Sequence, residues 1–373
     1  PVTPRGGTVT GRERVRTVLS GSIPDRVPLH MNADKWVVGE LKKAVGCDDD
    51  RELLGRLAID TFDTRGITQK DGVMPRYVGP PHPTLDDGWA GNILAIWGVT
   101  ESEVRTASGM GYAMGPPPLA PAQTLADVDS YSWPSADWFN FAGLRSRLEA
   151  WREFSVIASG ASVFQHATYL RGMDNFLVDM MTAPEIAHAV LDRFTSFYES
   201  FFGRILAECE GLIDVLSMAD DLGTQQSLLI SPELFEEFVA PRIARMADLA
   251  HSFGVKLLLH TDGNVRSLIP RFVELGVDIL DPLQPEAEGM SPADLKREFG
   301  QSLVLRGGVS TQHVLAGGSE ADVRAEVDRR IAELAPGGGY ILSPGHPVLQ
   351  TDVPAVNIVT MYETARELGR YQS

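Results

Sequence analysis

Short apolar runs recur along the chain, and each closes on polar residues or glycine. They are rich in Val, Ile and Leu and have the length of buried strands. The eight runs cover residues 26–32, 59–65, 154–161, 212–221, 255–263, 277–284, 303–309 and 340–346. Stretches in which apolar residues recur with helical spacing lie between most of them. Strands that alternate with helices predict an α/β fold with a parallel sheet and right-handed crossovers.

The clearest helix is predicted over residues 231–254. Ser231 is expected to cap it, Pro232 suits its first turn, and Gly254 suits its end. Residues 184–211 predict either one long amphipathic helix or a broken pair. Further helices are expected over residues 10–21, 264–276 and 320–338.

Eight strand–helix units in a chain of this length match a single (β/α)8 TIM barrel that spans residues 1–373. A doubly wound open sheet is the alternative, but it usually carries a glycine-rich loop after its first strand, and none follows residues 26–32. Residues 66–150 interrupt this alternation of strands and helices, and they contain many Pro and Gly residues. We expect them to be an insertion after strand 2, which is either a lid over the barrel mouth or a surface excursion without a role there.

Composition narrows the possible partners and the compartment. The formal charge is 33 − 50 = −17, and such an acidic surface repels nucleic-acid backbones. Cys47 and Cys209 do not make a disulfide framework, which is typical of a reduced cytoplasmic protein. The first residues lack an apolar run of signal-peptide length, and no run is long enough to span a membrane. We therefore expect a cytoplasmic protein without nucleic-acid or membrane partners.

The reactive residues of a barrel lie at the carboxyl ends of its strands. Acids, arginines and histidines that converge on one mouth favour an enzyme. A serine-hydrolase elbow is missing, and neither cysteine lies at a strand end. The candidates at or just after the strand ends are Asn32, Asp63, Arg65, Phe164, His166, Asp220, Asp221, His260, Asp262, Gln284, Arg306 and His346.

Several candidates have two interpretations. Asp220 and Asp221 are either turn and capping residues or a functional pair, because adjacent carboxylates repel unless a cation lies between them. Arg306, in an apolar strand, and Arg171 each need a carboxylate partner, which is either a protein acid or a substrate.

His260 and Asp262 face the same way, because side chains alternate along a strand. His346 ends the last strand, which in a barrel lies next to the first. Two imidazoles and one carboxylate suffice for a three-ligand metal site with open positions. They also suffice for a metal-free acid–base site.

Several ordered motifs resemble the uroporphyrinogen decarboxylase superfamily over roughly residues 154–368. They include "YLRGMDNFLVDMMTAPE", "DDLGTQQSLLISPELFEEFVAPRI", "VKLLLHTDGN" and "GGGYILSPGHPVLQTDVPAVNI", with weaker support from "RERVRTVLSGSIPDRVPL" near the start. The resemblance implies a (β/α)8 barrel. It also implies one of two activities: cofactor-free decarboxylation of a tetrapyrrole, or zinc-dependent methyl transfer that involves a corrinoid protein.

The sequence differs from the decarboxylases and from the zinc methyltransferases at residues that bind substrate or metal. The decarboxylases carry an arginine-rich "RQAGR" segment that binds substrate carboxylates, whereas residues 30–36 read "HMNADKW". The zinc methyltransferases carry two cysteine ligands where this chain has Asp262 and His346. The metal ligands implied by the resemblance are therefore His260, Asp262 and His346, a harder set that suits zinc but also Fe(II), Mn or Co(II).

The leading hypothesis is a metal-dependent methyltransferase or demethylase that acts on a small methylated substrate. Its acceptor would be a corrinoid protein, which brings the cobalamin, or another acceptor. Asp220 and Asp221 would serve as acid, base or further ligand, and Arg171 and Arg306 would hold a substrate carboxylate or order the acids. The alternatives are a decarboxylase that uses His346 and an acid, and a non-catalytic binding protein. Barrels of this family often pair, which makes a homodimer the expected assembly.

Overall fold

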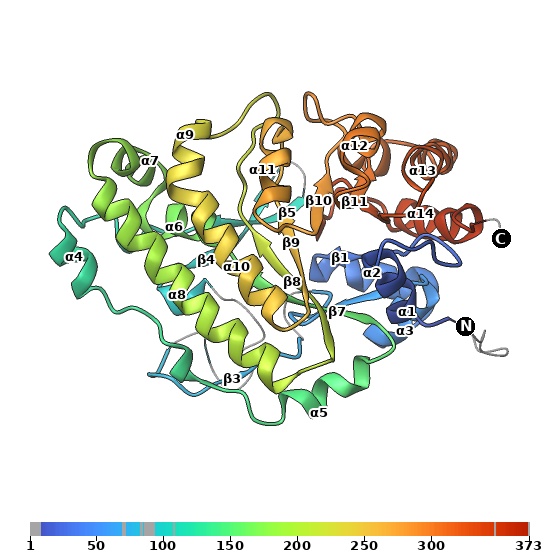
Figure 1. Cartoon of the computed structure of the whole chain (residues 1–373). Coiled ribbons are helices and arrows are strands. Elements are labelled where there is room, and N and C mark those ends of the chain that lie inside the picture. Colours follow the sequence, from blue (N-terminus) through green and yellow to red (C-terminus); the bar gives the residue numbers. More distant parts are fainter. Residues whose placement is uncertain are drawn as a thin grey trace.

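The fold is built around a curled sheet of seven parallel strands, as a computed structural model of the chain shows (Figure 1). The structure describes residues 9–68, 72–82, 85, 94–106, 109–346 and 348–371. The strand order is β12-β11-β10-β9-β8-β7-β2. The strands are β2 (Thr61–Asp63), β7 (Ser155–Ala161), β8 (Ile213–Ala219), β9 (Lys256–His260), β10 (Ile279–Leu283), β11 (Val304–Val309) and β12 (Tyr340–Pro344).

Residues 28–33 contact both edges of this sheet. The amide of His30 donates to Leu342 O on β12 at 3.0 Å, and Asp60, just before β2, donates from its amide to Leu29 O at 2.9 Å. β1 (Asn32–Ala33) then pairs in parallel with β13 (Val348–Leu349). The mixed α/β fold and its parallel sheet are thus as predicted. The complete eight-stranded barrel stays a prediction, because the continuous ladder has seven strands.

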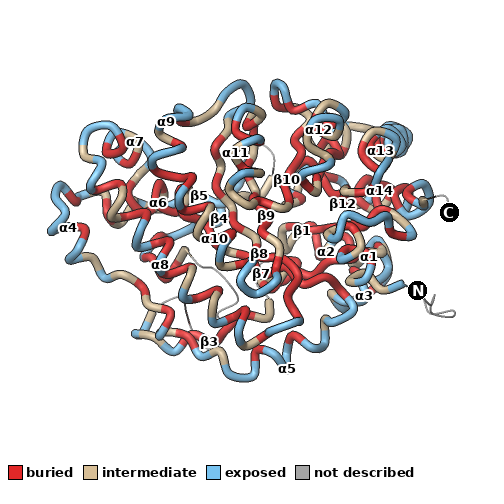
Figure 2. Tube along the Cα trace, viewed as in Figure 1, coloured by how far each residue is buried: buried red, intermediate tan, exposed pale blue. Residues whose placement is uncertain are grey.

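Both faces of the sheet are buried, as expected of parallel strands covered by helices (Figure 2). α8 and α10 lie in front of the sheet in Figure 1, and α8 is one continuous helix rather than a broken pair. The helices are α1 (Gly11–Leu19), α2 (Lys35–Val45), α3 (Asp50–Arg56), α4 (Leu125–Ser130), α5 (Leu144–Leu148), α6 (Phe164–Arg171), α7 (Met173–Thr182), α8 (Pro184–Glu208), α9 (Pro232–Leu234), α10 (Ala240–Ser252), α11 (Ile269–Glu274), α12 (Pro292–Phe299), α13 (Glu320–Leu334) and α14 (Ala355–Leu368).

The predicted helix at 231–254 begins where its capping residues indicate. Ser231 accepts a hydrogen bond from the Leu234 amide, and Gly254 adopts a positive φ of 68° just after the helix. Its interior differs from the prediction, because a π-helical turn over Phe235–Val239 separates α9 from α10. None of the described helices is long and apolar enough to cross a membrane.

α1 covers the end of the sheet at which the strands begin. Its apolar face packs Val15 and Val18 against Ile341 at the start of β12. Its arginines make ion pairs across the strand starts, and the pair between Arg14 Nη1 and Asp60 Oδ1, at 2.6 Å, is almost fully buried. This ionic layer stabilises the end of the sheet opposite the strand ends that carry the candidate chemistry.

Parts of the segment 66–150 pack in two places, one on α8 and one beside the loop after β13. Trp97 packs on α8, with its ring centroid 4.0 Å from that of Phe194 and 4.9 Å from that of Phe197. β3 (Arg76–Tyr77) pairs with β6 (Phe139–Asn140), and β4 (Glu101–Thr106) pairs with β5 (Gly109–Met114). The β4–β5 hairpin contacts the loop after β13, where the Met110 amide donates to Thr351 Oγ1 at 3.0 Å. Residues 69–71, 83–84, 86–93 and 107–108 of the predicted insertion lie outside the described residues. Its role as a lid stays a prediction.

We expect Trp97→Ala to lower the free energy of unfolding by about 3–5 kcal/mol, because it removes a fully buried ring from the aromatic cluster on α8. Met181→Ala, at a side chain on α7 that is 76% exposed, is the control and should change stability by less than about 0.5 kcal/mol. Urea unfolding followed by circular dichroism measures both changes. Equal effects of the two substitutions would contradict the packing described here.

Candidate functional site at the strand ends

His260 occupies the last position of β9, after three buried leucines, and its ring is held from the neighbouring strand. β10 places Asp281 in register with His260, and Asp281 Oδ2 lies 3.0 Å from His260 Nδ1. Because an ionised carboxylate only accepts hydrogen bonds, Nδ1 carries the proton. Nε2 then faces two further carboxylates, at 3.6 Å from Asp221 Oδ1 and 4.0 Å from Asp262 Oδ2.

Asp281 is itself held by Arg306 of β11. Arg306 Nε donates to Asp281 Oδ1 at 2.5 Å, and both side chains are at least 94% buried. Burial alone would raise the pKa of Asp281, but Arg306 and His260 outweigh it and lower that pKa well below its usual range. The carboxylate partner of Arg306 is therefore a protein acid.

The acids around His260 also set its charge in the metal-free protein. Burial opposes protonation, but the hydrogen bond to Asp281 and the charges of Asp262, Asp281 and Asp221 raise the pKa of His260 to about 9. Burial raises the pKa of Asp262, opposed by His260 and His346. The cluster thus surrounds a cationic ring with carboxylates, an environment that also attracts a metal cation.

Asp262 has a buried carboxylate oxygen that is left for a ligand such as a metal. Its Oδ1 is buried and has no hydrogen-bond partner among the described residues, which is uncommon for a carboxylate oxygen in a protein interior. Its Oδ2 lies 3.8 Å from His346 Nε2. His346 Nδ1 lies 2.9 Å from Val348 O, to which it donates, so this ring also presents Nε2 to the cluster.

Ligand atoms of Asp221, His260 and Asp262 all lie within 4.8 Å of one another. This spacing allows one cation to reach all three, and the two oxygens and one nitrogen suit a divalent metal. His346 borders this trio through Asp262. Of the predicted ligands, the structure therefore brings His260, Asp262 and His346 to one place and adds Asp221.

Asp220 and Asp221 are adjacent in sequence but face different surroundings. Asp220 is fully buried and accepts hydrogen bonds from the Gln165 amide at 2.9 Å, the Val163 amide at 3.3 Å and Ser162 Oγ at 3.1 Å. Burial raises the pKa of Asp220 to about 7. Asp221 accepts from Gln165 Nε2 at 2.5 Å and from the Asp262 amide at 3.2 Å. Asp220 thus holds the start of α6, whereas Asp221 belongs to the cluster.

A second polar group lies at the ends of β2 and β7. Ser159 Oγ donates to Asp63 Oδ1 at 2.5 Å and accepts from Arg65 Nε at 2.9 Å. Nearby, His166 Nδ1 lies 2.6 Å from the Tyr198 hydroxyl. Burial and the charge of Arg65 lower the pKa of His166 to about 3, so this imidazole is neutral.

Four further predicted residues are engaged within the protein. Arg171 Nε donates to Asp179 Oδ2 at 2.7 Å, so its carboxylate partner is also a protein acid. Gln284 Oε1 accepts from the Gly263 amide at 2.8 Å and fixes the turn after β9. Phe164 packs edge-on against a buried aromatic ring of α7, and Asn32 Oδ1 accepts from the next amide in the chain at 3.0 Å.

Two residues of the cluster were not among those predicted from the sequence. Asp281 lies in the middle of the apolar run "VDILDPLQ", where a charge without a visible partner could have been noticed as Arg306 was. Gln165, the second residue of α6, carried no signal in the sequence, because its role depends on how α6 lies beside the end of β8.

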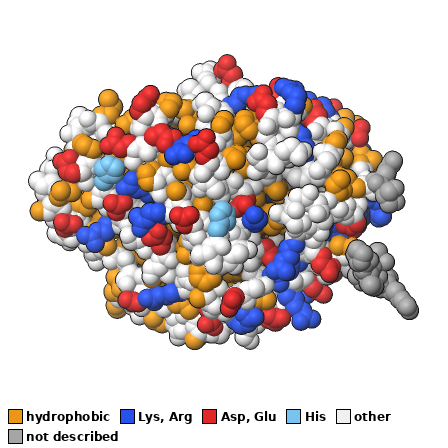
Figure 3. Space-filling model, in the orientation of Figure 1, with side chains coloured by type: hydrophobic (Ala, Val, Ile, Leu, Met, Phe, Trp, Pro, Cys, Tyr) orange, Lys and Arg blue, Asp and Glu red, His pale blue; other side chains and the backbone are white. Residues whose placement is uncertain are grey.

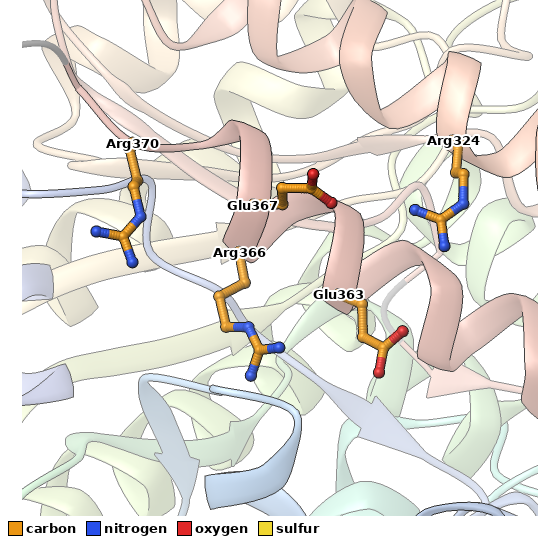
Figure 4. Close-up of a pocket in the computed structure, with 5 residues that line it drawn as sticks. All are labelled: Arg324, Glu363, Arg366, Glu367 and Arg370. Atoms are coloured by element: carbon orange, nitrogen blue, oxygen red, sulfur yellow. The ribbon is translucent and has the colours of Figure 1, made fainter.

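The largest hollow among those described lies elsewhere, on the outside of α13 and α14 (Figure 4). It measures about 460 Å³ and is open and highly charged. The side chains around it are Arg324, Glu363, Arg366, Glu367 and Arg370. None of them belongs to the strand-end cluster, and surface charges of both signs are interspersed elsewhere too, as the face in Figure 3 shows. We therefore place the candidate site at the strand ends, on the chemistry of its side chains.

A parallel α/β sheet with acids, imidazoles and an arginine gathered at its strand ends defines an enzyme-like fold with a polar site. The family model described as "Uroporphyrinogen decarboxylase (URO-D)" matches residues 107–368. The chain therefore belongs to the uroporphyrinogen decarboxylase family, as its motifs predicted.

The chain is similar to two methyltransferases, one by sequence and one by fold. A methylated-thiol–coenzyme M methyltransferase of Methanosarcina mazei is 32% identical over 115 residues, which are 31% of this chain and 29% of that protein. The chain thus matches under a third of this curated relative. A solved methyltransferase from Methanosarcina mazei superposes with a TM-score of 0.68, over 96% of this chain and 99% of that one, at 17% identity. At this identity the superposition shows a shared fold.

We expect Arg306→Leu to destabilise the protein by about 3–5 kcal/mol, because it leaves the buried Asp281 carboxylate uncompensated. The double variant Asp281→Asn with Arg306→Leu should recover part of this loss, because it removes the unpaired charge. Chemical denaturation of the two single variants and the double variant measures the coupling. Arg152→Leu, at an exposed ion pair, is the control, with an expected change under about 1 kcal/mol. Additive effects of the two substitutions would contradict a coupled pair.

Proposed function

We propose that this protein is a metal-dependent methyltransferase that removes a methyl group from a small methylated substrate. The observation that carries the proposal is the trio Asp221, His260 and Asp262, with a buried Asp262 oxygen that lacks a partner. His346 completes a set of two nitrogen and two oxygen donors. Such a set suits a divalent ion, with zinc as the first candidate.

The sequence match to a methylated-thiol–coenzyme M methyltransferase favours methyl transfer as the reaction. The relative's name specifies a methylated thiol and coenzyme M for that protein. In this chain a cluster of carboxylates and imidazoles would present a harder metal than a thiolate site does. We therefore propose that the substrate carries its methyl group on oxygen or nitrogen.

Side chains behind the candidate ligands would hold those ligands in the orientation that a metal needs. Asp281, fixed by Arg306, holds the Nδ1–H of His260, so that Nε2 is turned toward the ligand position. Gln165 orients Asp221 in the same way. A bound metal would act as a Lewis acid on the substrate heteroatom, which makes that atom a better leaving group when the methyl is transferred. Residues behind metal ligands commonly set ligand orientation and metal affinity.

The acceptor is proposed to be a corrinoid protein, or another acceptor that docks at the strand ends. Any cobalamin would arrive on that partner. The β4–β5 hairpin is proposed to cover part of the mouth. Its Tyr112 ring lies 6.0 Å from that of Trp36, which links the hairpin to the first turn of α2. Water exclusion at the mouth would strengthen the electrostatic interactions inside it.

We expect protein loaded with Zn²⁺ and desalted to retain about one equivalent of metal, measured by inductively coupled plasma mass spectrometry. His260→Ala and Asp262→Ala should retain almost none, because each removes a ligand from the trio. His313→Ala, at an exposed histidine outside the cluster, is the control and should retain the metal. Wild-type protein without metal after loading with zinc, iron, manganese or cobalt would overturn the proposal and favour a metal-free decarboxylase.

We expect the metal-loaded protein to methylate added cob(I)alamin when given methoxylated or N-methylated donors, with the absorbance change of the corrinoid as the measurement. Asp281→Asn should lower metal affinity or the methylation rate by about 10- to 100-fold, because His260 loses its orienting carboxylate. Turnover that survives complete removal of the metal by a chelator would contradict the mechanism.

A further inference from the structure

Arg65 differs from the other two arginines predicted to hold a substrate. Arg306 and Arg171 are buried against Asp281 and Asp179, so neither guanidinium needs a further anion. Arg65 is 22% exposed, and its Nε makes the hydrogen bond to Ser159. Its Nη1 and Nη2 make no hydrogen bond to any described residue. Those of Arg306 make none either, but Arg306 is 6% exposed and its charge is neutralised by Asp281.

Hydrogen bonds hold the backbone amide and Nε of Arg65, whereas Nη1 and Nη2 remain able to bind a ligand. The Arg65 amide donates to Asp63 Oδ1 at 2.8 Å, and Ser159 Oγ joins the same oxygen to Arg65 Nε. Asp63 Oδ1 lies 3.7 Å from Arg65 Nε, a longer separation than that of the paired arginines. A guanidinium held by its Nε edge presents two parallel N–H groups, the geometry that binds a carboxylate through two hydrogen bonds.

Arg65 lies at the same end of the strands as the candidate metal cluster. It follows the carboxyl end of β2, and its Nε bonds Ser159 near the end of β7, the strand next to β8. β2 and β9 are separated by β7 and β8, which amounts to about 14 Å along the sheet and less across its curl. The arginine side chain bridges part of this separation, so we infer that a substrate held between Arg65 and His260 spans less than it.

The charges at the candidate metal cluster and at Arg65 determine which end of a substrate would bind at each of them. Asp221 and Asp262 would already offset the charge of a divalent metal at the cluster, whereas Arg65 offers a cation whose Nη groups have no partner among the described residues. The neutral His166 beside it does not compete for an anion.

We propose that Arg65 forms a carboxylate-binding subsite, and that the substrate is a small carboxylic acid with its methyl-bearing heteroatom at the opposite end. The inference rests on the proposed methyl transfer and names its substrate class. It assigns to Arg65 the bidentate contact and to Ser159 and Asp63 the positioning of its guanidinium.

The test uses zinc-loaded full-length protein and pairs of probes that differ only in the acid group. 3-Methoxybenzoate and 4-methoxybenzoate are compared with the two corresponding methoxybenzyl alcohols by isothermal titration calorimetry. We expect at least one acid to bind ten times more tightly than its alcohol. Arg65→Ala should abolish this preference, and Arg65→Lys should keep part of it, because lysine restores the charge without the two-pronged geometry.

Arg152→Ala, at an arginine that is 68% exposed, is the matched control and should leave the preference unchanged. Zinc content of each variant confirms that the cluster is intact. The proposal is overturned if no acid outbinds its alcohol, or if the preference survives Arg65→Ala. In the second case, loss of the preference in His260→Ala would assign the acid to the metal instead. If the proposed methyl transfer is wrong, the protein will not methylate the corrinoid with either the acids or the alcohols. This outcome is distinct from a loss of the binding preference for acids.

Discussion

The site depends on one buried carboxylate. Asp281 lies in the interior of β10 between Arg306 of β11 and His260 of β9, and it is stable there because both of its oxygens are paired. This three-strand contact fixes the tautomer of His260 and the direction of Nε2. Asp262 and Asp221 then lie around that nitrogen, with Gln165 holding Asp221 from α6. The sheet register thus determines where the candidate ligands meet.

Local patterns were sufficient for most of the fold. Apolar runs located all seven strands of the main sheet, and Ser231 and Gly254 marked the ends of their helical segment. The region 66–150 could not be interpreted in this way, because its structure depends on distant contacts. The packing of Trp97 on α8, for example, joins parts of the chain about a hundred residues apart and leaves no periodic signal.

The candidate site was predictable only in part, for a related reason. Strand ends identified His260, Asp262, His346 and Asp221, because the carboxyl ends of parallel strands share one edge. The functions of Arg306 and Arg171 remained open, since a sequence does not reveal which carboxylate neutralises an arginine. Asp281 escaped notice because its partners come from two other strands.

The ion pairs of α1 lie at the opposite end of the strands from the candidate site. The contacts of Arg14 with Asp25 and Asp60 hold the strand starts together without involving any residue of the cluster. The ionic contacts at the strand starts are therefore independent of the cluster, whereas Arg306 and Asp281 serve both the stability of the sheet and the position of His260. Cluster residues outside the Arg306–Asp281 pair, such as Asp221 and Asp262, can therefore be exchanged while the strand starts stay joined. The chain can change the donor atoms at its strand ends without rebuilding the fold.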